Sequence, residues 1–216
     1  MKSKYEIYIF DLDGTLLDTL TDLCNACNYA LRTCGMKERT REEVRRFVGN
    51  GVRKLMERAV PEGTGPEQAE EALAFFREYY MEHSLDNTSP YPGIVEMLAG
   101  LHNQGVRIAV VSNKLHVATQ QLCEKFFNGL IDTAVGEQED KCIKKKPAPD
   151  MVKEALRLLH DNGERAVYVG DSDVDLQTAR NADLPCISVL WGFRDRDFLL
   201  ANGATTFVKT PSEIYS

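Results

Sequence analysis

One segment near the N-terminus settles the architecture of this chain: Ile7-Tyr8-Ile9-Phe10-Asp11-Leu12-Asp13-Gly14-Thr15. Its first four residues are apolar and rich in β-branched and aromatic side chains, which is typical of a buried strand in a parallel sheet. The strand then delivers two carboxylates, Asp11 and Asp13, to one place. Two close carboxylates repel each other, and the pKa of one rises unless a cation holds both charges. The segment therefore predicts a metal ion, a proton-sharing pair, or both, at the carboxyl end of a strand in an α/β sheet.

The composition is that of an ordinary globular protein. Of the 216 residues 43% are hydrophobic and 27% are charged, and the formal net charge is −7. This acidic balance argues against nucleic acid as the main partner. No apolar stretch approaches the roughly 18 residues that a membrane span needs. Six scattered cysteines without a secretory signal favour free thiols in a reducing compartment. We therefore expect a cytoplasmic protein that binds neither nucleic acid nor membranes.

A change in the pattern of predicted secondary structure divides the chain into two parts. Residues 17–87 have helical patterns and no strand pattern, whereas in residues 88–216 strand-like runs alternate with helical segments. Such alternation indicates right-handed βαβ units and a mostly parallel sheet. The prediction is an α/β protein whose doubly wound, Rossmann-like core comprises residues 1–16 and 88–216. An α-helical cap domain (17–87) would be inserted after the first strand, with hinges at 14–20 and 84–92.

The expected elements follow from periodicity, caps and breakers. Asp18 is expected to cap the first helix. Helices are predicted at about 18–34, 41–48, 52–60, 67–83, 94–102, 117–127, 149–160 and 175–182, and strands at 7–10, 106–111, 131–135, 166–169, 186–190 and 205–208.

Four polar clusters lie where predicted strands end or on tight loops. They are Asp11-x-Asp13, Ser112-Asn113-Lys114, Lys146-Pro147, and Gly170-Asp171-Ser172-Asp173-Val174-Asp175. Because the carboxyl ends of parallel strands meet at one edge of a sheet, we expect the clusters to converge. Together they would supply carboxylates, a hydroxyl, backbone N–H groups and an ammonium. That set suits a phosphoryl group and a hard cation such as Mg²⁺.

Each of these side chains has a natural part in such a site. Asp11 and Asp171 are the obvious carboxylate ligands for Mg²⁺. Ser112 can donate to a phosphate oxygen, helped by N–H groups at the start of the following helix, which it could also cap. Lys146 can neutralise charge, and Pro147 restricts its backbone to an extended form.

In this order the four clusters resemble the motifs of the haloacid dehalogenase superfamily. The resemblance covers nearly the whole chain, since the helical insert is similar to the small α-helical cap of that superfamily. Two further segments, Phe47-Val48-Gly49-Asn50-Gly51-Val52 and Trp191-Gly192-Phe193-Arg194, resemble its phosphoglycolate phosphatase branch.

The resemblance implies a role for each matching residue. Asp11 would be the nucleophile that forms an aspartyl-phosphate, and Asp13 would protonate the leaving alkoxide and then activate water. Members that cleave carbon–halogen bonds or phosphonates lack this second aspartate, so Asp13 favours phosphate esters. The implied metal ligands are Asp11, Asp13 (through its carbonyl), Asp171 and Asp175, the last directly or as an outer partner of the metal or the lysine. The implied phosphate-binding residues are Gly14, Thr15, Ser112, Asn113 and Lys146.

The cap offers two candidate specificity residues, Asn50 and Arg53. They lie in or beside the turn Gly49-Asn50-Gly51, which carries several basic neighbours. A carboxylated substrate needs a cation facing it, although a tight helix corner alone would also explain the glycines.

The favoured function is Mg²⁺-dependent hydrolysis of a small phosphorylated metabolite, with 2-phosphoglycolate as the best single guess. The alternatives are the same chemistry on pyrophosphate or a sugar phosphate, either as a phosphatase or as a mutase similar to β-phosphoglucomutase. A different class is a phospho-accepting signalling module similar to a response-regulator receiver.

Overall fold

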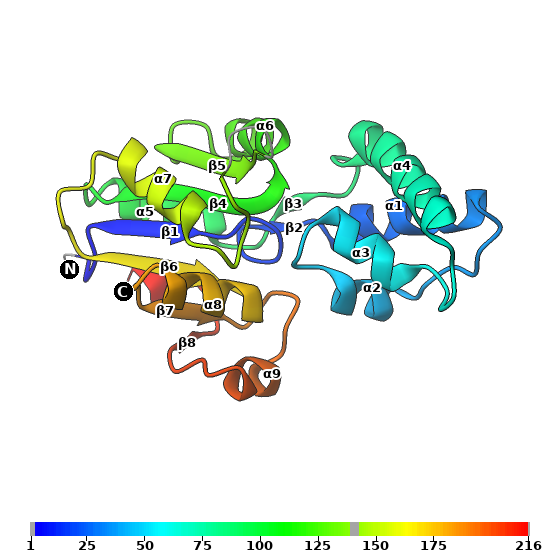
Figure 1. Ribbon diagram of the computed structural model, residues 1–216. Coiled ribbons are helices and arrows are strands. Elements are labelled where there is room, and N and C mark those ends of the chain that lie inside the picture. Colours follow the sequence, from blue (N-terminus) through cyan, green and yellow to red (C-terminus); the bar gives the residue numbers. More distant parts are fainter. Residues whose placement is uncertain (1–2, 139–142, 216) are drawn as a thin grey trace. The chain divides into compact units, whose positions relative to one another are not determined.

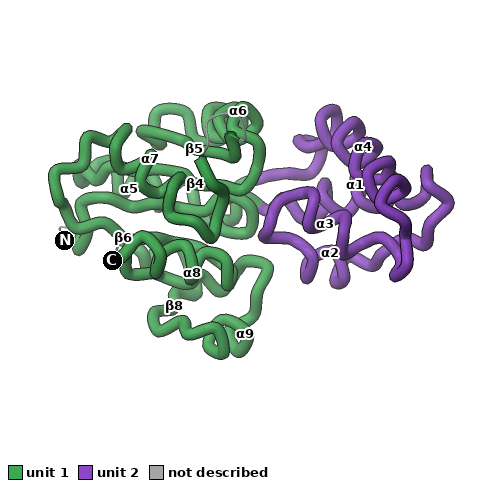
Figure 2. Tube along the Cα trace, viewed as in Figure 1, with its two compact units in different colours: residues 1–17, 90–216 green, residues 18–89 purple. Residues whose placement is uncertain are grey.

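The computed structural model describes residues 3–138 and 143–215, which form two compact units (Figure 2). We call residues 1–17 with 90–216 the core unit and residues 18–89 the helical unit. The described cysteines are all free thiols: Cys24, Cys27, Cys34, Cys123 and Cys186. The sixth cysteine, Cys142, lies outside the described residues.

The core unit contains a six-stranded sheet whose described pairings are all parallel (Figure 1). Its order is β5-β4-β1-β6-β7-β8, so the first strand lies in the middle. This confirms the doubly wound α/β fold, with the switch point beside β1. The strands are β1 (Ile7–Phe10), β4 (Arg107–Leu115), β5 (Thr133–Glu137), β6 (Ala166–Gly170), β7 (Cys186–Val189) and β8 (Phe207–Val208).

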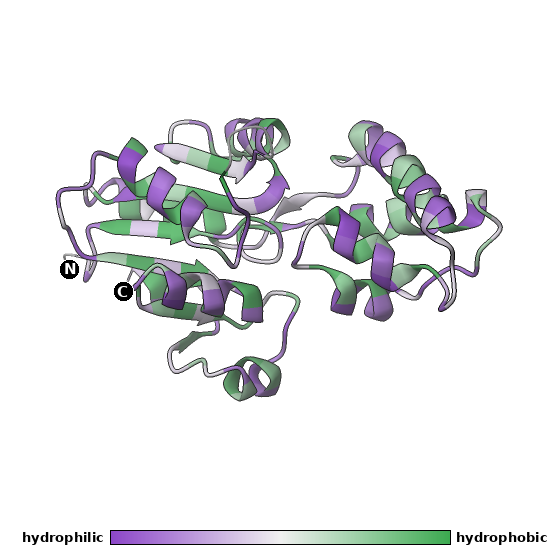
Figure 3. Ribbon diagram, in the orientation of Figure 1, coloured by the Kyte–Doolittle hydropathy of each residue, from purple (hydrophilic) through white to green (hydrophobic). Residues whose placement is uncertain are grey.

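Side chains of β1 alternate between two apolar cores. Tyr8 and Phe10 pack on one face with residues of α5 and α6, while Ile7 and Ile9 pack on the other with residues of α7 and α8. All four are at most 1% exposed, and such burial stabilises a fold by roughly 1.5–3 kcal/mol per large apolar side chain. The strands are accordingly mostly apolar in Figure 3. The core-unit helices are α5 (Ile94–His102), α6 (His116–Phe127), α7 (Asp150–Leu158), α8 (Asp173–Asn181), α9 (Arg196–Ala201) and the 3₁₀ helix η2 (Pro211–Ile214).

The helical unit consists of α1 (Leu20–Thr33), α2 (Arg41–Phe47), α3 (Val52–Ala59) and α4 (Pro66–His83). The two chain connections carry short strands, β2 (Leu17–Asp18) and β3 (Ser89–Pro90), which form a two-stranded sheet. The expectation of no strand between residues 17 and 87 is therefore wrong at its first two residues. Within the described ranges, no helix is long and apolar enough to cross a membrane.

Two expected helix caps are also wrong. The residue preceding α1 is Thr19, and Asp18 instead accepts a hydrogen bond from the Leu20 N–H at 3.2 Å. Strand β4 continues as far as Leu115, so Ser112 lies inside a strand and caps no helix. In both places the backbone stays extended for longer than local propensity suggests. Strand β2 pairs with β3, and β4 pairs with β5 again at Leu115 after a register shift that follows Val111.

Candidate active site

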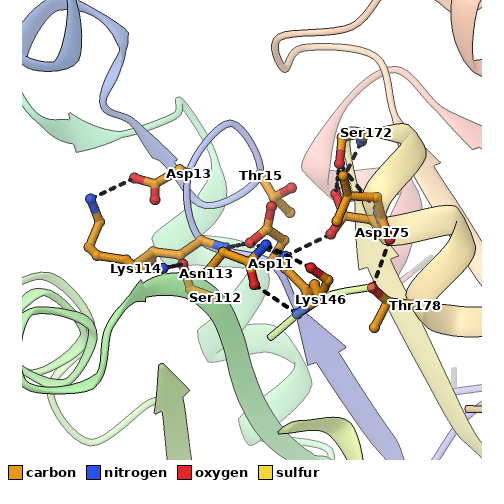
Figure 4. A network of polar contacts seen from close by, with 12 residues as sticks. Asp11, Asp13, Thr15, Ser112, Asn113, Lys114, Lys146, Ser172, Asp175 and Thr178 are labelled. Carbon is orange, nitrogen blue, oxygen red and sulfur yellow. Dashed lines mark hydrogen bonds and ion pairs between the residues drawn. The ribbon is translucent and has the colours of Figure 1, made fainter. Parts of the chain in front are cut away.

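The carboxyl ends of β1, β4 and β6 bring the predicted polar clusters to one edge of the sheet, as Figure 4 shows. Asp11, Asp171 and Asp175 each offer a carboxylate oxygen, and these oxygens all lie within 4.8 Å of one another. All three residues are buried. Residues that are 160 positions apart in sequence therefore form one acidic cluster, as the parallel topology predicts.

Lys146 supplies the cation of this cluster. Its Nζ lies 2.7 Å from Asp11 Oδ1 and 2.8 Å from Asp175 Oδ1, and its side chain is only 2% exposed. Burial alone would lower the pKa of Lys146, but the charges of Asp11 and Asp175 outweigh it and raise that pKa well above its usual value. The ammonium is therefore charged, and it is one cation beside three acidic side chains.

Asn113 fixes the position of this lysine. Its side-chain Oδ1 accepts the Lys146 N–H at 2.8 Å, and its Nδ2 donates to the Lys146 carbonyl at 3.1 Å. The sequence assigns Asn113 to phosphate binding; the structure shows its side-chain amide holding the Lys146 backbone, ahead of the cis Lys146–Pro147 bond.

Asp171 is held by the loop that follows β7. Its Oδ2 accepts the Phe193 N–H at 2.6 Å, and its Oδ1 lies 3.5 Å from the Thr15 hydroxyl. Burial, followed by the charge of Asp175, raises the pKa of Asp171 to about 7. When burial raises the pKa of a carboxyl group in this way, an added positive charge stabilises its ionised form.

Gly14 leaves room for this carboxylate. It has a φ of +88°, and a Cβ there would lie 2.5 Å from Asp171 Oδ2 and 2.9 Å from the Phe193 ring. Gly192 is packed as closely against Asp171 and the Gly14 carbonyl. Only glycine fits such approaches, so both glycines are part of the site's construction.

Asp175 has no spare hydrogen-bonding capacity. Its Oδ1 accepts from Lys146 and from the Tyr168 hydroxyl at 3.1 Å, and its Oδ2 accepts from the N–H and hydroxyl of Ser172 at 3.1 and 2.6 Å. Ser172 and Asp175 form a capping box at the start of α8. Four donors thus orient one carboxylate toward Lys146.

Asp13 lies beside the ammonium of Lys114, on the side of Asp11 that faces away from Asp175 (Figure 4). The Lys114 Nζ is 3.3 Å from Asp13 Oδ1. Ser112 is 1% exposed, and its Oγ accepts the Lys114 N–H at 3.2 Å. Asp13 and Ser112 therefore both lie among the polar side chains at the ends of β1 and β4.

The two candidates in the helical unit have partners within that unit. Asn50 Oδ1 accepts from the Arg58 guanidinium at 2.7 Å, and Arg53 forms an ion pair with Glu70.

Tyr168 is the polar residue that sequence reasoning missed. It lies in β6 between valines, where it reads as a core aromatic, but its hydroxyl contacts Lys146 Nζ at 3.2 Å and Asp175 Oδ1 at 3.1 Å. One signal was available: Tyr168 is two residues before Gly170-Asp171, in a strand that is otherwise aliphatic.

Comparisons with known proteins agree with this geometry. The family model described as haloacid dehalogenase-like hydrolase matches residues 8–189. A phosphoglycolate phosphatase of Aquifex aeolicus is 34% identical over 188 residues, which cover 87% of this chain and 85% of that protein. A crystal structure from Lactobacillus delbrueckii subsp. bulgaricus, named as a candidate phosphoglycolate phosphatase, superposes with a TM-score of 0.92 at 37% identity and full coverage of both chains.

A more distant neighbour has a ligand. A mutant form of CbbY from Rhodobacter sphaeroides, solved with xylulose-1,5-bisphosphate, superposes with a TM-score of 0.74 at 25% identity, over 97% of this chain and 96% of that one.

The match of the family model to most of the chain, the relatives and the parallel fold confirm the resemblance deduced from the four motifs. Phosphatases of this kind generally use a divalent metal, and the cluster of Asp11, Asp171 and Asp175 could bind one. The chain therefore belongs to the haloacid dehalogenase-like hydrolase family, in its phosphoglycolate phosphatase branch, and is a phosphatase.

Proposed function

We propose that this phosphatase is a Mg²⁺-dependent phosphomonoesterase that acts through an aspartyl-phosphate on Asp11, with 2-phosphoglycolate as its preferred substrate. One observation carries the chemistry: Asp11 is buried, paired with Lys146 at 2.7 Å, and within 4.8 Å of the Asp171 carboxylate. A nucleophile between an ammonium and a metal-binding carboxylate is what attack on an anionic phosphate needs.

The residues fit Mg²⁺. Three buried carboxyl groups lie together with one ammonium, so a second cation would stabilise their charged forms, and hard carboxylate oxygens are ligands that Mg²⁺ takes. Asp11 and Asp171 would hold the ion, with the Asp13 carbonyl as in the family. Because four donors already occupy Asp175, we place it as the partner of Lys146 rather than as a direct ligand. When bound, Mg²⁺ would neutralise charge on the phosphate and on the nucleophile.

The proposed reaction has two displacements. Asp11 attacks phosphorus, the bond from phosphorus to the ester oxygen breaks, and Asp13 gives its proton to the departing alkoxide. Asp13 then takes a proton from water as the water attacks the aspartyl-phosphate, which releases phosphate and restores Asp11. The Ser112 hydroxyl and the Lys146 ammonium bind the transferring phosphoryl oxygens throughout.

The substrate is proposed from the relatives. A curated protein 34% identical over most of both chains is named a phosphoglycolate phosphatase. The sugar bisphosphate bound by the CbbY mutant favours a sugar phosphate as the second candidate, at lower similarity. We further propose that the helical unit acts as a cap over the substrate and that the enzyme is cytoplasmic, in keeping with its described free thiols.

A panel of phosphorylated metabolites tests the substrate. With purified protein and Mg²⁺, we expect steady phosphate release with the highest kcat/KM for 2-phosphoglycolate. A higher kcat/KM for pyrophosphate or a hexose phosphate would overturn the substrate assignment while leaving the chemistry intact. A single burst without turnover would instead indicate a phospho-accepting module.

A further inference from the structure

Lys114 is a second lysine at this edge of the sheet, and the proposed chemistry does not use it. Its side chain is 7% exposed, and its Nζ lies 3.3 Å from Asp13 Oδ1. Asp13 Oδ1 receives no hydrogen bond from any of the described residues. The ammonium is thus held near the proposed acid–base residue by charge, without a well-aligned hydrogen bond.

The backbone of Lys114 is fixed on three sides. Its N–H donates to Ser112 Oγ at 3.2 Å, and its carbonyl lies 3.3 Å from the Thr119 hydroxyl. On the β5 side Gly136 approaches so closely that a Cβ there would lie 2.6 Å from the Lys114 oxygen. A lysine anchored in this way presents its ammonium at a defined place, as a binding group must.

The position of Asp13 indicates where a substrate would meet this ammonium. In the proposed reaction Asp13 contacts the ester oxygen that leaves with the alcohol. In a leaving group of the form O–CH₂–COO⁻, ordinary bond lengths put a carboxylate oxygen only about 3 Å from that ester oxygen. A carboxylate at this distance from the ester oxygen can come within ionic reach of Lys114 Nζ, which lies 3.3 Å from Asp13 Oδ1. Since a lysine ammonium has three N–H donors, it can bind this carboxylate while remaining beside Asp13.

We infer that Lys114 is the specificity residue of the core unit: it binds the carboxylate of the leaving group and so selects short phosphomonoesters of 2-hydroxy acids. This inference rests on the proposed function, and it moves the cation for that carboxylate from Arg53 to the end of β4. The phosphoryl group would be bound by Lys146 and the leaving group by Lys114, with Asp13 between the two.

The test pairs an enzyme change with a substrate change. Lys114→Met keeps most of the length of the side chain without its charge, and ethyl phosphate has a methyl group where 2-phosphoglycolate has its carboxylate. The readout is the ratio of kcat/KM for 2-phosphoglycolate to kcat/KM for ethyl phosphate. We expect Lys114→Met to lower this ratio about tenfold or more, as loss of a charge-assisted contact predicts. Lys114→Arg should restore part of it. Lys125→Met removes a cation on α6 that lies over Phe126, and it should leave the ratio unchanged.

The outcomes separate the two proposals. A wild-type ratio near one would reject 2-phosphoglycolate as the preferred substrate, and the inference with it. A high wild-type ratio that survives in Lys114→Met would overturn the inference alone. An equal loss for both substrates would also overturn it, because Lys114 would then act only through Asp13. If Lys114→Met does not fold, Lys114→Gln is compared by the same ratio.

Discussion

The hydroxyl of Tyr168 contacts both Lys146 Nζ and Asp175 Oδ1 and so helps to position them. Tyr168→Phe keeps the buried ring and removes only that contact. We expect kcat to fall roughly 2- to 10-fold, equivalent to about 0.5–1.5 kcal/mol, because Lys146 keeps its two carboxylate partners but loses its third contact. Steady-state kinetics with 2-phosphoglycolate measures the change.

Tyr8 provides the matched control for this variant. It is also a buried tyrosine of the sheet, but its hydroxyl lies near Ser3 and donates to the Ile214 carbonyl at 3.3 Å. Tyr8→Phe should therefore leave kcat unchanged. Equal effects of the two substitutions would show that the Tyr168 hydroxyl does not position the site.

Gly14→Ala tests the close approach of the backbone to Asp171. Both Gly14 and Gly105 have positive φ, so alanine at either costs roughly 1–2 kcal/mol of backbone strain. Only at Gly14 would the new Cβ also crowd Asp171 and Phe193, whereas at Gly105 nothing lies within 4 Å. We expect Gly14→Ala to weaken Mg²⁺ activation and lower kcat, and Gly105→Ala to lose stability alone. The measurement is enzyme activity as a function of Mg²⁺ concentration. Similar Mg²⁺ activation curves for the two variants would contradict the proposed crowding of Asp171.

The metal-free protein should have an unusual pH dependence of stability. Burial and the Asp175 charge raise the pKa of Asp171 from 3.8 to about 7. Between these values the folded state holds a proton that the unfolded chain has lost, so this group lowers the stability of the metal-free fold as pH rises. Bound Mg²⁺ removes the penalty, so it should raise Tm more at about pH 8 than at about pH 5. Equal Mg²⁺-induced shifts at the two pH values would contradict a shared acidic site.

Single residues were predictable from sequence where a charged group follows an apolar strand. Asp11, Asp13, Ser112 and Asp171 each stand out because a carboxylate or hydroxyl that directly follows a run of buried apolar residues has no packing reason to be there. The side-chain role of Asn113 was not predictable, since it depends on a partner 33 positions away whose backbone conformation no local pattern reveals.

At the level of elements, Asp22 in α1 holds the end of the helical unit in place. Buried at 2% exposure, its carboxylate accepts from the N–H groups of Asn87 and Thr88, the Asn87 amide and the Thr88 hydroxyl, at 2.8–3.1 Å. Asp22→Ala leaves these donors without an acceptor, so we expect a loss on the order of 2–4 kcal/mol. Urea unfolding measures it. The control is Asp18→Ala, which removes the contact to the Leu20 N–H and an exposed ion pair with Arg41, and which should cost about 1 kcal/mol or less. Comparable losses of stability in the two variants would show that the hydrogen bonds to Asp22 add nothing.

Long elements with a clear period and the short apolar strands β1, β7 and β8 were predicted, whereas other short elements were not. Helix α5 has the predicted ends, and α4 differs by one residue at its start. The strands β2 and β3 and the helices α9 and η2 were absent from the prediction. These elements of two to six residues contain too little periodicity to detect, and in the two short strands tertiary pairing fixes the structure.

For the whole molecule, the topology was predictable because few arrangements satisfy the rules for parallel sheets. Right-handed crossovers and a chain that returns beside its first strand leave β1 between β4 and β6. The sequence could not show which cation would meet the leaving group. That depends on the distance between the Lys114 and Asp13 side chains, which are carried by different strand ends.

The central claim is that Asp11, beside Asp171 and Lys146, carries the phosphoryl group with the help of a divalent cation. The direct measurement uses 2-phosphoglycolate labelled in its phosphoryl group. The enzyme is quenched with acid during turnover, and the labelled peptide is then mapped. We expect label on Asp11 in the presence of Mg²⁺, none after chelation, and neither label nor turnover in Asp11→Asn. Label on another residue, or undiminished turnover by Asp11→Asn or by the chelated enzyme, would contradict the proposed chemistry.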